Sequence, residues 1–174
     1  MQNRAALAIV FRNMTDQAVT TYTFEDFTPG RRFDFAARTL TTDEIIAFAS
    51  EFDPQPMHLD EEAGRASILG GLAASGWHTS ALMMRMLYEA YINGSTSEGS
   101  PGVDLMEWKR PVLAGDTLGG HCVVLEARAS RSRPEIGIVR MRAEVTNQRG
   151  ELVAVSEYIN MMRLAEKEAD HAHG

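Results

Sequence analysis

The chain has 174 residues, 44% of them hydrophobic and 24% charged, which is the composition of a globular domain with a substantial core. Its 17 Lys and Arg against 24 Asp and Glu give a net charge of −7 without a basic run, which argues against nucleic-acid binding because phosphate neutralisation supplies that affinity. The only cysteine, Cys122, allows no internal disulfide and fits a reducing, cytoplasmic compartment.

The pattern divides the chain into one domain and two ends. Residues 1–23 show no regular hydrophobic period and are expected to be an N-terminal extension. Residues 24–164 hold the predicted helices and strands, and the polar residues 165–174 are expected to form a C-terminal tail. No repeat or linker divides the central part, so we expect one folding unit.

The first predicted elements are a strand and a helix that lead to an acidic residue. Arg32–Thr39 alternates apolar and polar residues, the pattern of a strand with one buried face. Thr41 and Glu44 have capping-box spacing, which predicts that a helix begins there and delivers the chain into Asp53. A short helix follows Asp60, with an acidic first turn as the helix dipole favours. The strand residues expected to face the core are Phe33, Phe35 and Ala37.

Asp53 and His58 stand in a loop that contains two prolines, Pro54 and Pro56. Each proline fixes φ and biases the preceding residue toward extended backbone, so the loop is expected to be stiff. Stiffness suits a catalytic pair, since a carboxylate and an imidazole together can hold a water, remove its proton and return a proton to carbon. The alternative is that Asp53 caps a local turn and His58 is an ordinary hydrogen-bonded histidine.

A glycine-rich turn leads into an apolar stretch, Trp77–Ile92, predicted to be a long helix enclosed by other structure almost all round. Arg85 and Glu89 interrupt the stretch, which argues against a membrane span of about 20 apolar residues. Ser75 is a suitable N-cap. Gly76 then lies in the first turn, where bare N–H groups and the helix dipole favour an anion such as a developing oxyanion. Tight packing is the alternative reason for the glycine.

The remaining histidines and the cysteine give weaker signals. His78, in the first turn of the long helix, is expected to pack or to hydrogen-bond substrate rather than to transfer protons. His58, His78 and His121 lack the spacing of metal ligands, so no metal site is expected. Cys122 falls in a predicted strand, where a buried, inert thiol is expected.

The second half of the chain reads as strands. A polar, glycine-rich loop, 95–102, separates them from the long helix. One strand, then helices, then antiparallel strands is an α+β order. A buried helix needs something to wrap it, so we predict a hot-dog fold, in which a curved antiparallel sheet encloses a long central helix. We expect a homodimer or a dimer of dimers with sheets paired edge to edge. The later strands are predicted at 104–112, 117–129, 136–146 and 152–162.

Three motifs in this order resemble one family. Asp53–Asp60, read as Asp-Pro-Gln-Pro-Met-His-Leu-Asp, resembles the Asp-x-Asn-Pro-x-His-x-Asp signature of the MaoC-like dehydratases, which include R-specific enoyl-CoA hydratases. Ala74–Gly76 resembles the family's Ala-His-Gly entry to the central helix, and Arg110–Leu118 resembles its Arg-Pro-Val-x-x-Gly-Asp-Thr-Leu turn. Gln55 replaces the usual asparagine and Ser75 the usual histidine, so contacts in the loop and to substrate are expected to differ.

The resemblance implies a hot-dog enzyme that adds water to a 2-enoyl thioester or removes it from a 3-hydroxyacyl thioester. Asp53 would orient the water and take its proton, His58 would assist as the second acid/base group, and the Gly76 N–H would stabilise the enolate. Coenzyme A would enter as part of the acyl-CoA substrate, with no separate cofactor. The residues expected to contact substrate are Gln55, Ser75, Trp77, His78 and Arg110.

Three alternatives stay open at this point. One is a dehydratase of branched or dicarboxylic hydroxyacyl-CoA, in which Arg85 or Arg110 would bind a second carboxylate. Another is a hot-dog acyl-CoA thioesterase, and the third is a non-catalytic acyl-CoA binding or accessory protein. Solvated surface charge is the alternative role for each candidate phosphate ligand of coenzyme A. Those candidates are Lys109, Arg110, Arg131 and Arg133.

Overall fold

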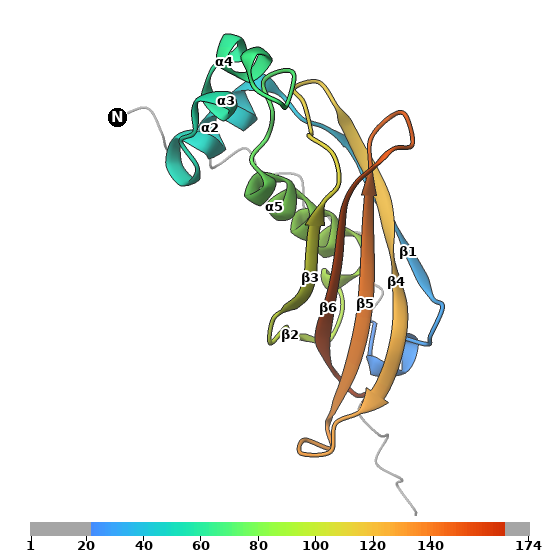
Figure 1. Ribbon diagram of the computed structural model, residues 1–174. Helices are drawn as coiled ribbons and strands as arrows, with labels where there is room; N and C mark the ends of the chain where they lie inside the picture. The colour runs from blue at the N-terminus through green and yellow to red at the C-terminus, as the bar shows by residue number, and fades with distance from the viewer. Residues whose placement is uncertain (1–21, 166–174) are drawn as a thin grey trace, which may run out of the picture.

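A curved antiparallel sheet wraps around one central helix in the computed structural model, which describes residues 22–165 (Figure 1). The sheet has the strand order β1-β4-β5-β6-β2, and β3 also pairs with β6. This is the predicted hot-dog fold. The strands are β1 (Arg32–Thr39), β2 (Ser97–Gly99), β3 (Val103–Trp108), β4 (Thr117–Ala129), β5 (Ile136–Thr146) and β6 (Leu152–Arg163). The helical segments are η1 (Phe24–Asp26), α2 (Thr42–Phe52), α3 (Pro56–Leu59), α4 (Glu61–Ala66), α5 (Gly76–Leu87) and η2 (Tyr88–Ile92).

The middle of the sheet follows the predicted alternation along β5. Its inward residues are buried, while Arg140 and Arg142 lie on the other face and donate to Glu157 of β6 at 2.8 and 2.9 Å. An alternating strand buries one face because successive side chains point to opposite sides. The buried β5 residues are Val139, Met141, Ala143 and Val145, as predicted.

One predicted core residue of β1 is exposed. Phe33 and Phe35 are buried, but Ala37 is not. The pairing of β1 with β4 is irregular between Phe35 and Arg38, and the alternation is lost there. The prediction for Ala37 was therefore wrong, because residue periodicity gives no sign of a bulge.

On β4, Cys122 is fully buried as predicted, and burial raises the pKa of its thiol to about 12, so the thiol stays protonated.

The central helix has the predicted length but is less enclosed than predicted. The α-helix α5 ends at Leu87, and the last predicted turn is the π-helical η2, whose C-cap is Asn93. Trp77 and Met84 are 64% and 50% exposed, so one face of α5 is not covered by this chain. The expectation of burial almost all round was wrong, since apolar residues also mark a face that a ligand or partner covers.

The connection from α5 back to the sheet also differs from the prediction. The polar loop expected over 95–102 contains the short strand β2, which pairs with β6. The strand expected over 104–112 ends at Trp108. Pro111 lies shortly beyond, and a proline cannot donate to a ladder, so the predicted strand was too long at its C-terminal end.

The helices α2 to α4 form a small lobe at one end of the sheet (Figure 1). The predicted capping box begins α2: the Thr41 hydroxyl accepts from the Glu44 N–H at 3.2 Å, and the Glu44 carboxylate accepts from the Thr41 N–H at 2.9 Å. The two-proline loop is more ordered than predicted, because Pro56 starts the single turn of α3. Asp60 then caps α4 by accepting from the Ala63 N–H at 2.8 Å.

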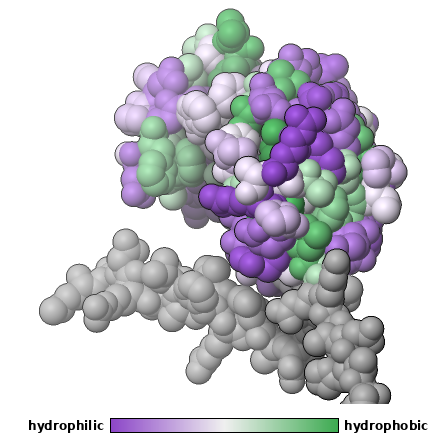
Figure 2. Space-filling model, turned by 90° about the horizontal axis from the view of Figure 1, so that it is seen from below, coloured by the Kyte–Doolittle hydropathy of each residue, from purple (hydrophilic) through white to green (hydrophobic). Residues whose placement is uncertain are grey.

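The surface of the described residues is mixed. Figure 2 shows separate hydrophobic patches among hydrophilic residues on the face seen from below, which is ordinary for a folded protein. Within residues 22–165, no helix is long and apolar enough to cross a membrane.

Candidate active site

Asp53 lies where α2 ends. It is the C-cap of the helix, and its backbone N–H donates to the Ala49 carbonyl at 3.0 Å. The turn that follows is closed by the Gln55 N–H, which donates to the Asp53 carbonyl at 2.8 Å. The Gln55 side-chain amide also donates to Asp53 Oδ1 at 2.8 Å. The residue that departs from the asparagine of the MaoC-like motif therefore binds the carboxylate directly.

His58 is held by its other ring nitrogen. It lies on α3, is 6% exposed, and its Nδ1 is 2.8 Å from the Ala73 carbonyl oxygen. A carbonyl only accepts, so Nδ1 carries a hydrogen and Nε2 of the neutral ring keeps its lone pair. Nε2 lies 3.7 Å from Asp53 Oδ2. The carboxylate and the imidazole therefore face each other, as the sequence predicted for the pair.

Ser75 connects the carboxylate to the central helix. Its hydroxyl donates to Asp53 Oδ2 at 2.6 Å and accepts from the Trp77 N–H at 3.2 Å, so one oxygen serves both the carboxylate and the N-cap of α5. The hydrogen bonds from Ser75 and then Gln55 are the main causes that lower the pKa of Asp53, because they favour its ionised form. Asp53 is therefore a carboxylate at neutral pH.

Gly76 is the first residue of α5, so its backbone N–H has no partner within the helix. A Cβ on Gly76 would come within 2.6 Å of the Trp108 ring, closer than real Cβ contacts. Packing against the indole thus requires a residue without a side chain at this position, which is compatible with a role for the Gly76 N–H as a hydrogen-bond donor to an anion. Trp108 is itself held by a bond from its Nε1 to the Ser80 hydroxyl at 3.2 Å.

A cavity of about 300 Å³ brings the imidazole and the amide together. His58 and Gly76 both line it, with Thr79 and Trp108 beside them. Asp53 is not among its lining residues; its carboxylate accepts from Ser75 and lies 3.7 Å from Nε2 of His58. The arrangement can bind a small polar group between a proton acceptor and a helix N-terminus.

The candidate phosphate ligands separate into two groups. Lys109 and Arg110 line the small cavity, and the Lys109 ammonium also pairs with Glu107 at 2.6 Å. Arg131 and Arg133 line neither of the two cavities identified over residues 22–165. Arg110 is thus brought to the site as predicted.

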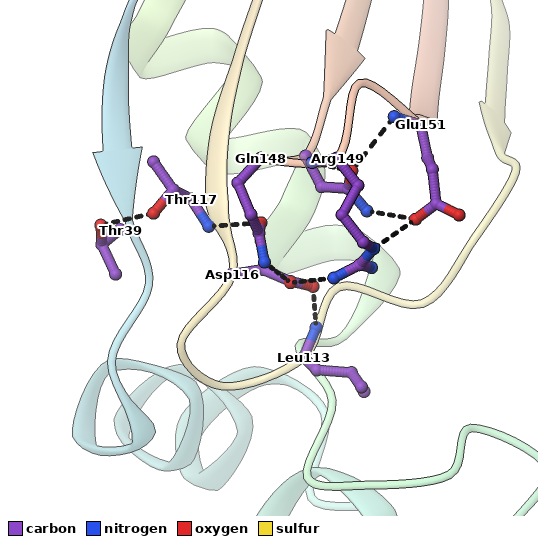
Figure 3. Close-up of polar contacts among 8 residues, drawn as sticks. Thr39, Leu113, Asp116, Thr117, Gln148, Arg149 and Glu151 are labelled. Carbon is purple, nitrogen blue, oxygen red and sulfur yellow. Dashed lines mark hydrogen bonds and ion pairs between the residues drawn. The ribbon is translucent and has the colours of Figure 1, made fainter.

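Asp116 is a buried aspartate that the sequence analysis did not select. It helps to position the side of the small cavity that Arg110 lines. Asp116 is 5% exposed; its Oδ2 accepts from the Leu113 N–H at 2.9 Å and its Oδ1 from the Gln148 amide at 2.8 Å, so the β5–β6 hairpin clamps the turn (Figure 3). Leu113 in turn bridges to Ala73, whose carbonyl holds His58. The Gly-Asp-Thr of the third motif was the available signal.

The larger cavity, of about 580 Å³, runs along the exposed face of α5. Trp77 and Ser80 line its start, and methionine, leucine and tyrosine side chains continue it toward β3 and β6. Trp77 meets Trp108 edge to face, with ring centroids 5.4 Å apart, and Trp108 lines the small cavity. The predicted substrate residue Trp77 thus stands between the two cavities.

His78 is placed away from this constellation. Its ring stacks on Phe48 of α2, with centroids 4.5 Å apart and planes 3° apart, and it lines neither cavity. Burial lowers the pKa of its imidazole, so the ring is neutral at pH 7. Of the two roles that the sequence left open for His78, the stack shows packing. Within residues 22–165 no group of three or more His, Cys, Asp or Glu side chains could hold a metal ion.

Comparison with known proteins places this chain in a family. A family model described as a MaoC like domain matches residues 24–147. The chain is 31% identical over 125 residues to the uncharacterized protein YdeM of Bacillus subtilis, an alignment that covers 72% of this chain and 87% of that protein. The chain therefore belongs to the MaoC-like dehydratase family.

Solved structures agree with this placement. The MaoC-like dehydratase from Rhodospirillum rubrum is 41% identical with a TM-score of 0.77, over 83% of this chain and 99% of that one. The R-hydratase PhaJ1 from Pseudomonas aeruginosa has a TM-score of 0.66 over 87% of this chain and 94% of its own. At 22% identity the second likeness supports the hot-dog fold alone.

Proposed function

We propose that this protein is a hydro-lyase that adds water to a 2-enoyl-CoA thioester, or removes it from the 3-hydroxyacyl thioester. The observation that carries the proposal is the meeting of two proton acceptors, Asp53 and His58 at 3.7 Å, beside the bare amide of Gly76. Membership of the MaoC-like dehydratase family and the 41% identity to the MaoC-like dehydratase from Rhodospirillum rubrum support it.

The pair suits a water molecule that donates one hydrogen bond to Asp53 and one to His58 Nε2 and directs its oxygen at the β-carbon; the hydrogen on the Asp53 side stays on the oxygen and the other passes to Nε2. As the C–O bond forms, electrons move to the thioester oxygen, where the Gly76 N–H and the α5 dipole stabilise the negative charge. The proton lost by the water then returns to the α-carbon. Every atom of the water ends in the product, so no further reactant is needed.

The hydrogen bonds around Asp53 change the catalytic roles expected for Asp53 and His58. Sequence reasoning gave the proton of the water to Asp53. Ser75 and Gln55 lower the pKa of this carboxyl, which makes it a weaker base, whereas an imidazole is in general the stronger base of the two. We therefore assign orientation of the water to Asp53 and proton transfer to Nε2 of His58.

A homodimer is part of the proposal. The edge strand β3 pairs with β6 on one side only among the described strands, and it carries the exposed side chains Val103 (58%) and Trp108 (46%). Together with the exposed face of α5 they form an apolar surface of the kind that partners cover. Sedimentation equilibrium should give the mass of two chains or of a multiple of two; a monomer over the whole concentration range would refute this part.

The test of the chemistry is substitution of each acceptor. Asp53→Asn and His58→Gln should each lower the rate of crotonyl-CoA hydration by at least about 10²-fold, the usual scale for loss of a positioned proton carrier. The measurement is the loss of conjugated enoyl absorbance. Glu51→Gln, which neutralises a nearby exposed carboxylate on α2, is the matched control and should keep the wild-type rate.

Three results would contradict the proposal. Near-normal hydration by Asp53→Asn or His58→Gln, with circular dichroism unchanged, would remove that residue from the mechanism. Release of free thiol by the wild-type protein, without loss of enoyl absorbance first, would replace hydration by thioester hydrolysis. Binding without turnover across a panel of enoyl-CoA chain lengths would instead indicate a binding protein.

A further inference from the structure

The far end of the larger cavity carries a buried polar cluster that the proposed chemistry does not use. The Tyr91 and Tyr158 hydroxyls are 3.2 Å apart, and the Asn160 amide donates to the Tyr91 hydroxyl at 3.1 Å. Ser97 donates to the Asn160 carbonyl oxygen at 3.0 Å. All four residues line the cavity, and the first three are at most 7% exposed.

This cluster lies at the opposite end of the cavity from the proton-transfer site. The cavity starts at Trp77, next to Gly76, and follows α5 through Leu87 to Tyr91. At about 1.5 Å per residue the distance along the helix from Trp77 to Tyr91 is roughly 20 Å. An acyl chain that entered beside Gly76 would therefore lead its distal end to the two tyrosines.

The hydrogen bonds within the cluster do not use all of its donor hydrogens. Two tyrosine hydroxyls carry two protons, and the bond between them uses one. The other proton stays on whichever hydroxyl accepts that bond, and where this is Tyr158 the neighbouring acceptor is the thiol of Cys122. A thiol is a weak acceptor, so an oxygen atom in the cavity is the better partner for that proton. The Asn160 amide has a second N–H as well, because its bond to Tyr91 uses only one.

The cavity wall also restricts the charge of its occupant. None of its lining residues, all within the part of the chain that the structure describes, is Asp, Glu, Lys, Arg or His. A carboxylate without a cationic partner is costly to bury, whereas a neutral group with hydrogen bonds is not. A plain hydrocarbon end would leave the spare donors unpaired.

We propose that the preferred acyl chain ends in a neutral oxygen-bearing group, such as a hydroxyl or a ketone, which Tyr158 and Asn160 bind at the end of the cavity. The inference rests on the proposed function, since it takes the chain to be that of a CoA thioester. It names Tyr158 and Asn160 as specificity-determining residues that touch the distal end and take no part in proton transfer.

The experiment measures binding, so that it does not depend on turnover. Saturated CoA thioesters of equal chain length, ending in methyl, hydroxyl or carboxylate, are titrated into the full chain by calorimetry. The hydroxyl end should bind about 5- to 10-fold more tightly than the methyl end, as one added hydrogen bond provides. Tyr158→Phe should abolish this preference with methyl-end affinity unchanged. Tyr88→Phe, the same change at a tyrosine that does not line the cavity, should retain it.

Each outcome of the titrations supports or refutes the proposed occupant of the larger cavity. Equal or weaker binding of the hydroxyl end by the wild-type protein would overturn the inference, whatever the variants do. Tighter binding of the carboxylate end would refute the neutral occupant. A hydroxyl preference in a protein that hydrates no enoyl-CoA would leave the binding inference standing and refute the proposed reaction.

Discussion

The two cavities on α5 differ in what lines them and in how far apart their residues lie in the chain. The small one combines an imidazole, a helix N-terminus, Lys109 and Arg110. The large one is lined by neutral side chains only, within the described residues, and gathers them from α5, the β2–β3 arm and β6. Both begin within one turn of the start of the same helix.

The two cavities depend on contacts of different separation along the chain. The proton-transfer groups all come from Asp53–Gly76, and the hydrogen bonds that hold them join residues 15 and 22 positions apart. The larger cavity depends on pairings such as β6 with β2 and β3, which join residues far apart in sequence. Substitutions in the larger cavity can therefore change which acyl chain is accepted while the chemistry of the small cavity stays the same.

The largest expected effect is at the border of the two cavities. Gly76→Ala should lower the free energy of unfolding by about 1–3 kcal/mol, because the new Cβ meets the Trp108 ring at 2.6 Å and the indole must move. Chemical denaturation measures the change. Gly71→Ala is the matched control, since its Cβ would make ordinary contacts of 3.6 and 3.7 Å with Leu113, and a change within about 0.5 kcal/mol is expected.

A second-site variant separates packing from chemistry. Gly76→Ala with Trp108→Leu should recover stability, because the clash is relieved. If the Gly76 amide serves the oxyanion, hydration should stay slow in the double variant, since the methyl group still crowds the ligand at the amide. Recovery of both stability and rate would show that the glycine is required by the indole alone.

Much of the small cavity could be predicted from sequence because its signals are local. The two prolines, the capping box at Thr41 and the N-cap Ser75 each act over a few residues, and the structure shows them as expected. The exposed face of α5 could not be predicted, since apolar residues such as Met84 look the same whether they face core or cavity. The bulge in β1 and the role of Asp116 depend on contacts with distant strands.

A smaller effect is expected on pH dependence. Ser75→Ala removes the hydrogen bond that contributes most to the lowered pKa of Asp53, so the pKa should rise toward its ordinary value. Asp53 must be ionised to orient the water, so the acid limb of kcat/KM should move to higher pH. The lowered pKa stabilises the fold above the unfolded-state pKa and is lost as pH falls through the folded value, so the variant should also lose stability at neutral pH.

The pH dependence of kcat/KM is checked with one control variant, and one result would contradict the prediction. Ser80→Ala removes a hydroxyl from the next turn of α5 that contacts Gly76 and Trp108 but not Asp53, and it should leave the acid limb in place. An unshifted acid limb in Ser75→Ala, with activity retained, would mean that the limb does not report Asp53. The chemistry would then need another ionised group.

The smallest expected effect is at Arg85, a candidate to bind the second carboxylate of a dicarboxylic substrate. Arg85 lies on the exposed side of α5, where its Nε pairs with Glu89 at 2.6 Å and its guanidinium stacks on Tyr88 with 5.7 Å to the ring centroid. It lines neither cavity, so Arg85→Met should leave kcat/KM unchanged for methyl-ended and carboxylate-ended enoyl thioesters alike. An exposed pair one turn apart contributes about 0.3–0.5 kcal/mol, so stability should fall by no more than that. A selective loss on the carboxylate-ended substrate would restore the dicarboxylic alternative and would place a charge in a cavity whose neutral wall argues against one.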